Sequence, residues 1–297
     1  MTIDTLIFDM DGVITTEEKY WACARLTLWE LVTETLGLKD AFGDAMRDEA
    51  IREAIAPDEH IYTLKGRAVN SNWDITYMLV CVYLSALPDV TVLSAPTPEM
   101  LLEAIREGMT IAAPWPEAMS AFLRGTGGAK GRALIQAAGA RLQTALDFGD
   151  ADLLRVEGPL WWYLHTRFQR WYSGETMTEH QAAPLSDGTV IPAARLAETL
   201  KALREEGYTL GSATGRTREE LEDALGERGK LDGLRVVLAG DLKHGRTVHS
   251  LLRALYPRAD TEVLLDEQFQ KLKRGNVVVI GDSTSDVLMA KAAGCHS

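Results

Sequence analysis

The sequence has 297 residues, of which 46% are apolar and 25% are charged, a composition typical of soluble globular proteins rather than of disordered or fibrous chains. With 31 basic and 43 acidic side chains the formal charge is −12, which disfavours nucleic acids and anionic membranes as partners because both require a basic surface. The length suits two domains or one large one, and a small phosphorylated ligand remains compatible with the charge.

Cysteine usage and the N-terminus indicate a cytoplasmic protein. Cys23, Cys81 and Cys295 have neither the spacing of metal ligands nor a pairing pattern, so we expect reduced thiols. Residues 1–9 carry acids where a signal peptide would carry basic residues. The longest apolar run, residues 77–87, is shorter than the ~20 residues that span a bilayer.

The first two-thirds of the chain predicts one strand followed by helices. Residues 5–8 are continuously apolar, as in a strand buried on both faces, and the run ends at Asp9. No strand is predicted between Thr16 and Pro184. Apolar residues instead recur at helical spacing in seven segments: 17–36, 42–56, 73–87, 98–107, 116–124, 129–147 and 158–172.

After Pro184 strands and helices alternate. Such alternation indicates βαβ units and a parallel sheet. We therefore expect an α/β domain made of residues 1–15 and 184–297, interrupted by a helical domain at 16–183. The predicted strands are 208–212, 236–239 and 276–280, and the predicted helices are 191–206, 217–225, 247–255 and 286–293.

Three of the predicted strands end in polar residues, at 9–12, 212–216 and 281–286. The carboxyl ends of parallel strands meet at one edge of a sheet, where ligands bind. Clustered carboxylates repel one another unless a hard cation lies among them, and oxygen ligands alone point to Mg²⁺. Glycines in these segments leave room for backbone amides to approach an anion.

These three segments, in this order, resemble motifs I, II and IV of the haloacid dehalogenase superfamily. The matching residues are Asp9-x-Asp11-Gly12, Thr214-Gly-Arg and Gly281-Asp282-Ser-x-x-Asp286. The resemblance covers residues 1–14 and roughly 184–294, and an insertion just after motif I is similar to the family's C1-type cap, although larger. It implies a Rossmannoid core, a parallel sheet flanked by helices, with a large all-helical inserted cap domain.

The resemblance also implies roles at the matching positions. Asp9 would be the nucleophile that forms an aspartyl-phosphate. Asp11 would protonate the leaving oxygen and then activate water as a base. The Thr214 hydroxyl and the Gly215 amide would bind the transferring phosphoryl group, with Gly12 also at the phosphate.

A Mg²⁺ ion is the implied cofactor. Asp9 and Asp282 would hold it together with the backbone carbonyl of Asp11. Asp286 would either support the metal site or cap the helix that it begins. Lys243 is our choice for the lysine of motif III, which neutralises nucleophile and phosphate; the usual Lys-Pro-x-Pro is absent there, and the alternative is a surface lysine.

The function implied is that of a Mg²⁺-dependent phosphatase, a phosphoric monoester hydrolase, acting on a small phosphorylated metabolite. A phosphomutase similar to β-phosphoglucomutase, or a non-catalytic binding protein on the same fold, are the alternatives. A dehalogenase proper is disfavoured because that branch lacks the aspartate found here as Asp11. The expected partner is the small substrate, with neither nucleic acid nor membrane, and the oligomeric state is open.

Overall fold

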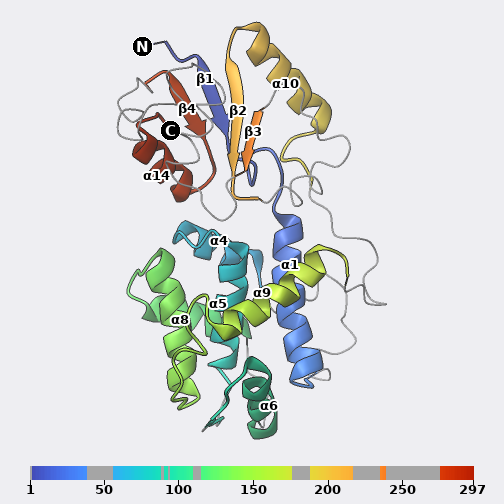
Figure 1. Ribbon diagram of the computed structural model, residues 1–297, viewed down its shortest axis with the longest axis vertical. Helices are drawn as coiled ribbons and strands as arrows, with labels where there is room; N and C mark the ends of the chain where they lie inside the picture. Colours follow the sequence, from blue (N-terminus) through green and yellow to red (C-terminus); the bar gives the residue numbers. More distant parts are fainter. Residues whose placement is uncertain are drawn as a thin grey trace. The chain divides into compact units, whose positions relative to one another are not determined.

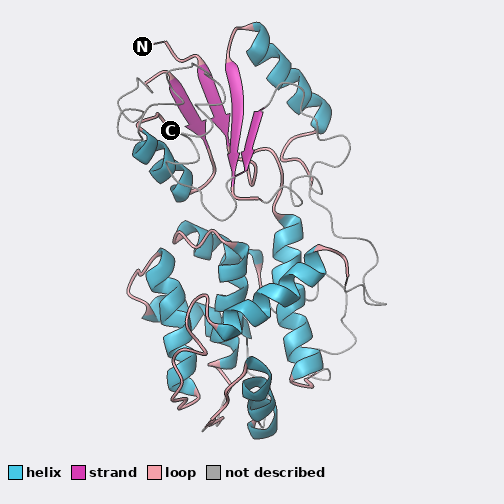
Figure 2. Ribbon diagram, viewed as in Figure 1, coloured by secondary structure: helices cyan, strands magenta, loops and turns pink. Residues whose placement is uncertain are grey.

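The computed structural model describes residues 2–38, 56–87, 90–92, 94–109, 115–175, 188–216, 235–238 and 275–297. The predicted helices 42–56, 217–225 and 247–255, and Lys243, lie outside these residues. The chain divides into two compact units (Figures 1 and 2). We call Met1–Glu18 with Ser186–Ser297 the sheet unit, and Lys19–Leu185 the helical unit.

Four parallel strands form the sheet within the described residues, in the order β3-β2-β1-β4. They are β1 (Thr5–Phe8), β2 (Thr209–Thr214), β3 (Arg235–Leu238) and β4 (Val277–Ile280). The strand from the N-terminus therefore lies between two strands from the C-terminal third, with Phe8 in register with Ser212 and Ile280. The predicted α/β class is confirmed.

Two described helices cover the sheet, α10 (Ala193–Glu205) and α14 (Thr284–Ala293). Successive side chains of a strand point to opposite faces, so Ile7 packs on one face while its neighbours Leu6 and Phe8 pack on the other. The two faces carry separate apolar clusters. With Ile7 lie Ala213, Val277, Val279, Met289, Ala290 and Ala293, and on the other face Met10, Ile14, Leu196, Leu200 and Leu210.

The segment that leaves the sheet unit is paired with the segment that returns to it. Thr15 and Thr189 form an antiparallel bridge. The N–H of Thr16 donates to the carbonyl of Gly188 at 2.9 Å, and the N–H of Gly188 donates to the Thr16 hydroxyl at 2.9 Å. The two segments that connect the sheet unit to the helical unit are thus hydrogen-bonded to each other within the sheet unit.

The helical unit is built around α5, whose residues from Ile75 to Leu84 are all buried. Helices α7, α8 and α9 pack on it. None of the described helices has the length and apolarity needed to cross a bilayer. The bounds are α1 Glu18–Glu30, a π-helix η1 Leu31–Thr35, α4 Asp58–Gly66, α5 Asn72–Leu84, α6 Pro98–Gly108, α7 Trp115–Gly125, α8 Gly131–Ala145 and α9 Pro159–Tyr172.

Helix α4 was not predicted from the sequence. Only His60, Ile61 and Leu64 of its nine residues are buried. Two apolar side chains at i and i+3 are too few to establish a helical period by themselves. Packing against the rest of the helical unit, rather than a periodic sequence, stabilises this element.

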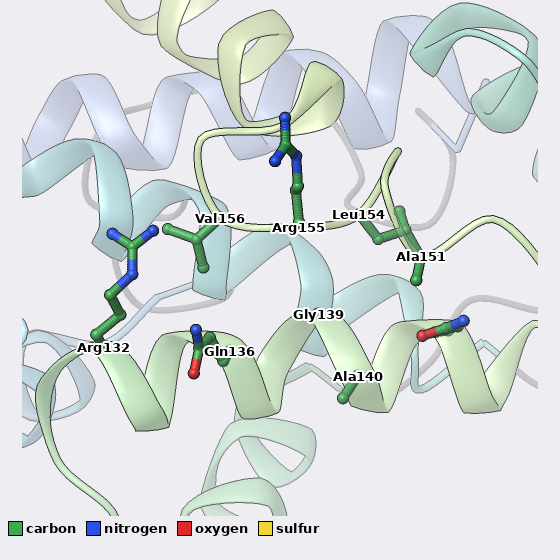
Figure 3. A pocket seen from close by; sticks show the side chains of 9 residues that line it. Arg132, Gln136, Gly139, Ala140, Ala151, Leu154, Arg155 and Val156 are labelled. Carbon is green, nitrogen blue, oxygen red and sulfur yellow. The ribbon is translucent and has the colours of Figure 1, made fainter.

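A glycine permits close packing between α5, α8 and the loop before α9. The Tyr77 hydroxyl donates a hydrogen bond to the carbonyl of Leu154. Gly139 of α8 lies directly against this contact, and Gly139 and Leu154 both line a recess of about 310 Å³ (Figure 3). A Cβ at residue 139 would lie 2.3 Å from the Tyr77 oxygen and 2.7 Å from the Leu154 carbonyl oxygen. No side chain larger than hydrogen fits there without a shift of these groups.

We expect Gly139→Ala to lower the free energy of unfolding of the helical unit by about 1–3 kcal/mol, because the methyl group overpacks this contact. Gly66→Ala is the matched control, since a Cβ at residue 66 meets nothing within 4 Å. It should raise the stability by up to about 1 kcal/mol through helix propensity. All seven tryptophans lie between residues 21 and 171, so their fluorescence during urea unfolding follows the helical unit alone. Equal effects of the two substitutions would contradict the packing argument.

Candidate active site

Asp9 follows β1 directly and continues the sheet. Its N–H donates to the carbonyl of Ile280 at 2.8 Å, which fixes the backbone at the end of the strand. One carboxylate oxygen, Oδ1, accepts a hydrogen bond of 2.7 Å from the N–H of Met10. The residue is 1% exposed, so its carboxylate is buried and held in one orientation.

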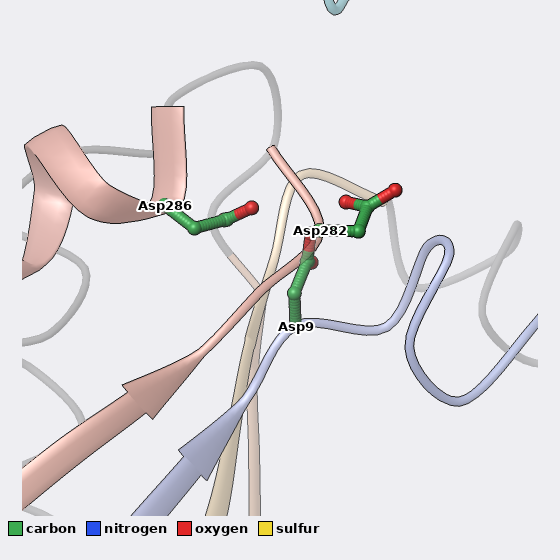
Figure 4. Close-up of side chains that lie close together, drawn as sticks. All are labelled: Asp9, Asp282 and Asp286. Carbon is green, nitrogen blue, oxygen red and sulfur yellow. The ribbon is translucent and has the colours of Figure 1, made fainter. Parts of the chain in front are cut away.

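Asp282 and Asp286 bring two more carboxylates to the same place. They lie in the turn after β4 and in the first turn of α14, and one oxygen of each of the three side chains lies within 4.8 Å of the others (Figure 4). Asp9 and Asp286 are buried, whereas Asp282 is exposed. The neighbouring positions of β1 and β4 in the sheet produce this cluster, which we call the acidic cluster.

Asp286 also organises the start of α14. It forms a reciprocal capping box with Ser283, in which the N–H of Ser283 donates to Asp286 Oδ2 at 3.1 Å. The Ser283 hydroxyl donates to the same oxygen at 2.5 Å. Asp286 therefore caps the helix and is a member of the acidic cluster at the same time.

Two glycines allow the backbone to approach the acidic cluster closely. Gly12 has a φ of +72°, and a Cβ there would lie 2.1 Å from Oδ2 of Asp282. A Cβ at Gly281 would lie 2.3 Å from the Cβ of Asp286. Larger residues at either position would displace a carboxylate of the cluster.

The donor set fits a hard divalent cation. It contains only carboxylate oxygens, which such cations prefer, and it has no sulfur or imidazole ligand among the described residues. Three like charges this close repel one another, and a bound cation would remove that repulsion. Asp9, Asp282 and Asp286 are the residues that would hold it.

Thr214 and Gly215 stand at the end of β2, beside β1. Thr214 is fully buried, and its hydroxyl oxygen accepts a hydrogen bond of 3.1 Å from the N–H of Arg216. The sheet order therefore places the predicted phosphate-binding threonine on the strand that neighbours the strand of Asp9.

Asp11 does not join the acidic cluster with its side chain but forms an ion pair with Arg216. The guanidinium Nε and Nη2 lie 2.7 and 2.6 Å from Oδ1 of Asp11. Sequence reasoning included Arg216 in the second motif yet gave it no role. An arginine directly after Thr-Gly at a strand end was the available indication, but nothing in the sequence identified its partner 205 positions earlier.

Three side chains with strongly raised pKa values lie in the core of the helical unit. Burial raises the pKa of the Cys81 thiol to about 12 and that of Tyr83 also to about 12. Burial likewise raises the pKa of Tyr77. These side chains stay protonated at neutral pH, so Cys81 is a packing residue rather than a nucleophile.

Comparison with known proteins agrees with this geometry. Residues 168–297 match the model of the haloacid dehalogenase-like hydrolase family. A phosphoglycolate phosphatase of Vibrio vulnificus strain YJ016 is 33% identical over 100 residues, which cover 34% of this chain and 40% of that protein.

Other similarities are shorter or more distant. The aspartate carbamoyltransferase catalytic subunit of Saccharophagus degradans is 44% identical over 64 residues, 18% of this chain and 19% of that protein. The one from Thermoplasma acidophilum is 35% identical over 119 residues, 37% of this chain and 39% of that protein. The chain thus spans only 19–40% of the length of these curated relatives.

An X-ray structure of a Northeast Structural Genomics Consortium target has the same fold. It superimposes with a TM-score of 0.67 and 21% identity, covering 99% of this chain and 88% of that chain. The family match begins at residue 168, so β1 lies outside it, but β1 pairs with β2 and β4, which both lie inside. The N-terminal strand is thus an integral part of the sheet of the region, residues 168–297, that matches the haloacid dehalogenase-like hydrolase family.

Proposed function

We propose that the protein is a Mg²⁺-dependent phosphatase that acts on a small phosphorylated metabolite through an aspartyl-phosphate. The observation that carries the proposal is the acidic cluster of Asp9, Asp282 and Asp286 at the carboxyl ends of adjacent parallel strands. The match of residues 168–297 to a hydrolase family and the likeness to a phosphoglycolate phosphatase support it.

In this proposal Asp9 is the nucleophile. The N–H of Met10 holds its carboxylate in a fixed orientation, which favours attack along one direction. A bond forms between an Asp9 oxygen and phosphorus while the ester P–O bond breaks, and the bonding electron pair stays on the leaving oxygen. Water then attacks phosphorus, which releases inorganic phosphate and regenerates the carboxylate.

Asp11 handles the protons in both steps. Its side chain is 15% exposed and lies two residues after the nucleophile, apart from the acidic cluster. The carboxyl group gives a proton to the leaving oxygen in the first step, and the resulting carboxylate accepts a proton from the attacking water in the second.

The remaining groups bind phosphate and metal. The hydroxyl of Thr214 and the amide of Gly215 would donate hydrogen bonds to the phosphoryl oxygens, Gly12 would lie beside the phosphate, and Lys243 would add a positive charge. A Mg²⁺ ion held by Asp9, Asp282 and Asp286, with the Asp11 carbonyl, would offset the negative charge that nucleophile and phosphate bring together.

Small phosphorylated acids such as 2-phosphoglycolate are the first substrates to test, given the phosphatase relative. A phosphomutase would use the same aspartates but would return the phosphoryl group to an organic acceptor. Release of inorganic phosphate at the rate of substrate loss separates the two, and the absence of turnover on a broad panel of phosphate esters would favour a non-catalytic binding protein.

We expect Asp9→Asn to fold normally and to lose turnover by at least about 10³-fold, because an amide is a poor nucleophile of nearly the same shape. Release of phosphate from p-nitrophenyl phosphate measures the loss, and circular dichroism checks the fold. Asp147→Asn, at an exposed position of the helical unit, serves as the control. A rate near that of the unsubstituted protein for Asp9→Asn would refute the assignment.

Chelation with EDTA should abolish turnover, and Mg²⁺ should restore it. Asp282→Asn should raise the Mg²⁺ concentration needed for half-maximal rate by roughly 10-fold or more, because one charged ligand is lost. Binding has an independent readout, since a ligand of the folded state raises the melting temperature, and this rise should be smaller in Asp282→Asn. Full activity in EDTA would show that the acidic cluster does not serve a metal-dependent reaction.

Asp11→Asn should slow the reaction by roughly 10²–10⁴-fold for alkyl phosphates, which need a proton on the leaving oxygen. Phosphate esters with good leaving groups, such as 2,4-dinitrophenyl phosphate, should lose much less in single-turnover measurements of the first step. An equal loss for all esters would exclude Asp11 as the acid.

A further inference from the structure

We propose that Arg216 is the positioning residue of Asp11, fixing which carboxyl oxygen of Asp11 exchanges protons with the substrate. The proposal rests on the proposed function and adds to it a residue outside the roles assigned above. Two observations carry it: the contacts of the guanidinium group, and the deeper burial of Arg216 compared with Asp11.

Both contacts from the arginine go to one oxygen of the carboxyl group. Nε and Nη2 lie 2.7 and 2.6 Å from Oδ1 of Asp11. Two nitrogens of a rigid planar group hold this oxygen in place. Proton exchange with the substrate is thereby assigned to Oδ2, the other oxygen.

The same nitrogen, Nη2, also contacts the segment that leaves the sheet unit. Nη2 lies 3.2 Å from the hydroxyl of Thr15 and donates to the carbonyl of Thr16 at 3.3 Å. The Thr15 hydroxyl donates in turn to the carbonyl of Met10 at 3.1 Å. Arg216 is thus held by the segment that leaves the sheet unit and cannot follow Asp11 if that side chain rotates.

Arg216 and Asp11 differ in burial, as expected if the arginine supports the acid rather than contacting the substrate. The Arg216 side chain is 1% exposed, whereas the Asp11 side chain is 15% exposed. The cation lies inside, and the acid keeps access to solvent. A buried ion pair contributes little net stability because desolvation offsets its attraction. Stability alone therefore does not account for an arginine at this position.

A displaced carboxyl group would impair one part of the reaction. As the ester P–O bond breaks, the electron pair stays on the leaving oxygen and the proton moves to it from Oδ2 of Asp11. Misplacement of a catalytic group by about 1 Å can cost roughly 10²-fold in rate. The rate should fall for substrates whose leaving oxygen needs a proton. It should change little for substrates whose leaving group is stable as an anion.

The test uses the full chain with Mg²⁺ and a series of aryl phosphates from phenyl phosphate to 2,4-dinitrophenyl phosphate, measured in single turnovers. We expect Arg216→Met to slow phenyl phosphate by roughly 10–10²-fold with little change for the dinitrophenyl ester. Added guanidinium ion should restore part of the loss. In the background of Asp11→Asn the same substitution should have no further effect, because the group it positions is gone.

Arg195→Met, which removes an exposed arginine of α10, is the matched control and should leave the leaving-group dependence unchanged. If Arg216→Met does not fold, Arg216→Lys keeps the charge without the planar fork and should show the same selective loss. Equal losses for all esters, or losses that add to those of Asp11→Asn, would overturn the proposal and indicate direct phosphate binding by Arg216.

The outcomes separate this inference from the function on which it rests. Failure of the unsubstituted protein to hydrolyse even 2,4-dinitrophenyl phosphate would refute the phosphatase and this proposal together. If that protein is active and Asp9→Asn is not, an unselective effect of Arg216→Met refutes only the positioning role.

Discussion

A four-residue strand at the start of the chain determines where everything else in the sheet unit lies. β1 has hydrogen-bonded neighbours on both sides, with Thr5 in register with Thr209 and with Val277. Both of its faces are covered, which is why its sequence lacks polar alternation. Because β1 lies between β2 and β4, the residues that follow β1 lie between the ends of those two strands.

This convergence brings negative charges close together. The two aspartates after β1 differ in which charged groups surround them. Asp9 lies within 4.8 Å of Asp282 and Asp286, a separation at which each pair of charges repels by roughly 3–4 kcal/mol at an effective dielectric constant of about 20. Asp11 instead has a protein cation, Arg216, as its partner. The ion pair thus offsets the charge of Asp11, and in the proposed function a bound cation would offset the repulsion within the acidic cluster.

The sequence predicted the sheet well because its strands are short, continuously apolar and bounded by polar residues, as at 5–8 and 276–280. Because strand ends in a parallel sheet share one edge, it also predicted that four carboxylates, those of Asp9, Asp11, Asp282 and Asp286, would converge. Three of them do, whereas the side chain of Asp11 pairs with Arg216. Helix α4 escaped prediction because its apolar positions, Ile61 and Leu64, do not repeat. The pair between Asp11 and Arg216 escaped because partners 205 positions apart are joined only by tertiary structure, and Lys243 lies outside the described residues.

The contacts between α1 and α9 have a consequence for the order of folding. Tyr20 near the start of the helical unit stacks on Tyr172 near its end, with ring centroids 4.9 Å apart, and Lys19 lies over the same ring. Pairing β1 with β2 closes a loop of about 200 residues, and the entropic cost of closing a loop rises with the logarithm of its length. If the helical unit folds first, these aromatic contacts bring its ends together and leave an effective loop of about 50 residues. The closure then costs about 1–2 kcal/mol less, so a discontinuous sheet can assemble nearly as a continuous one would.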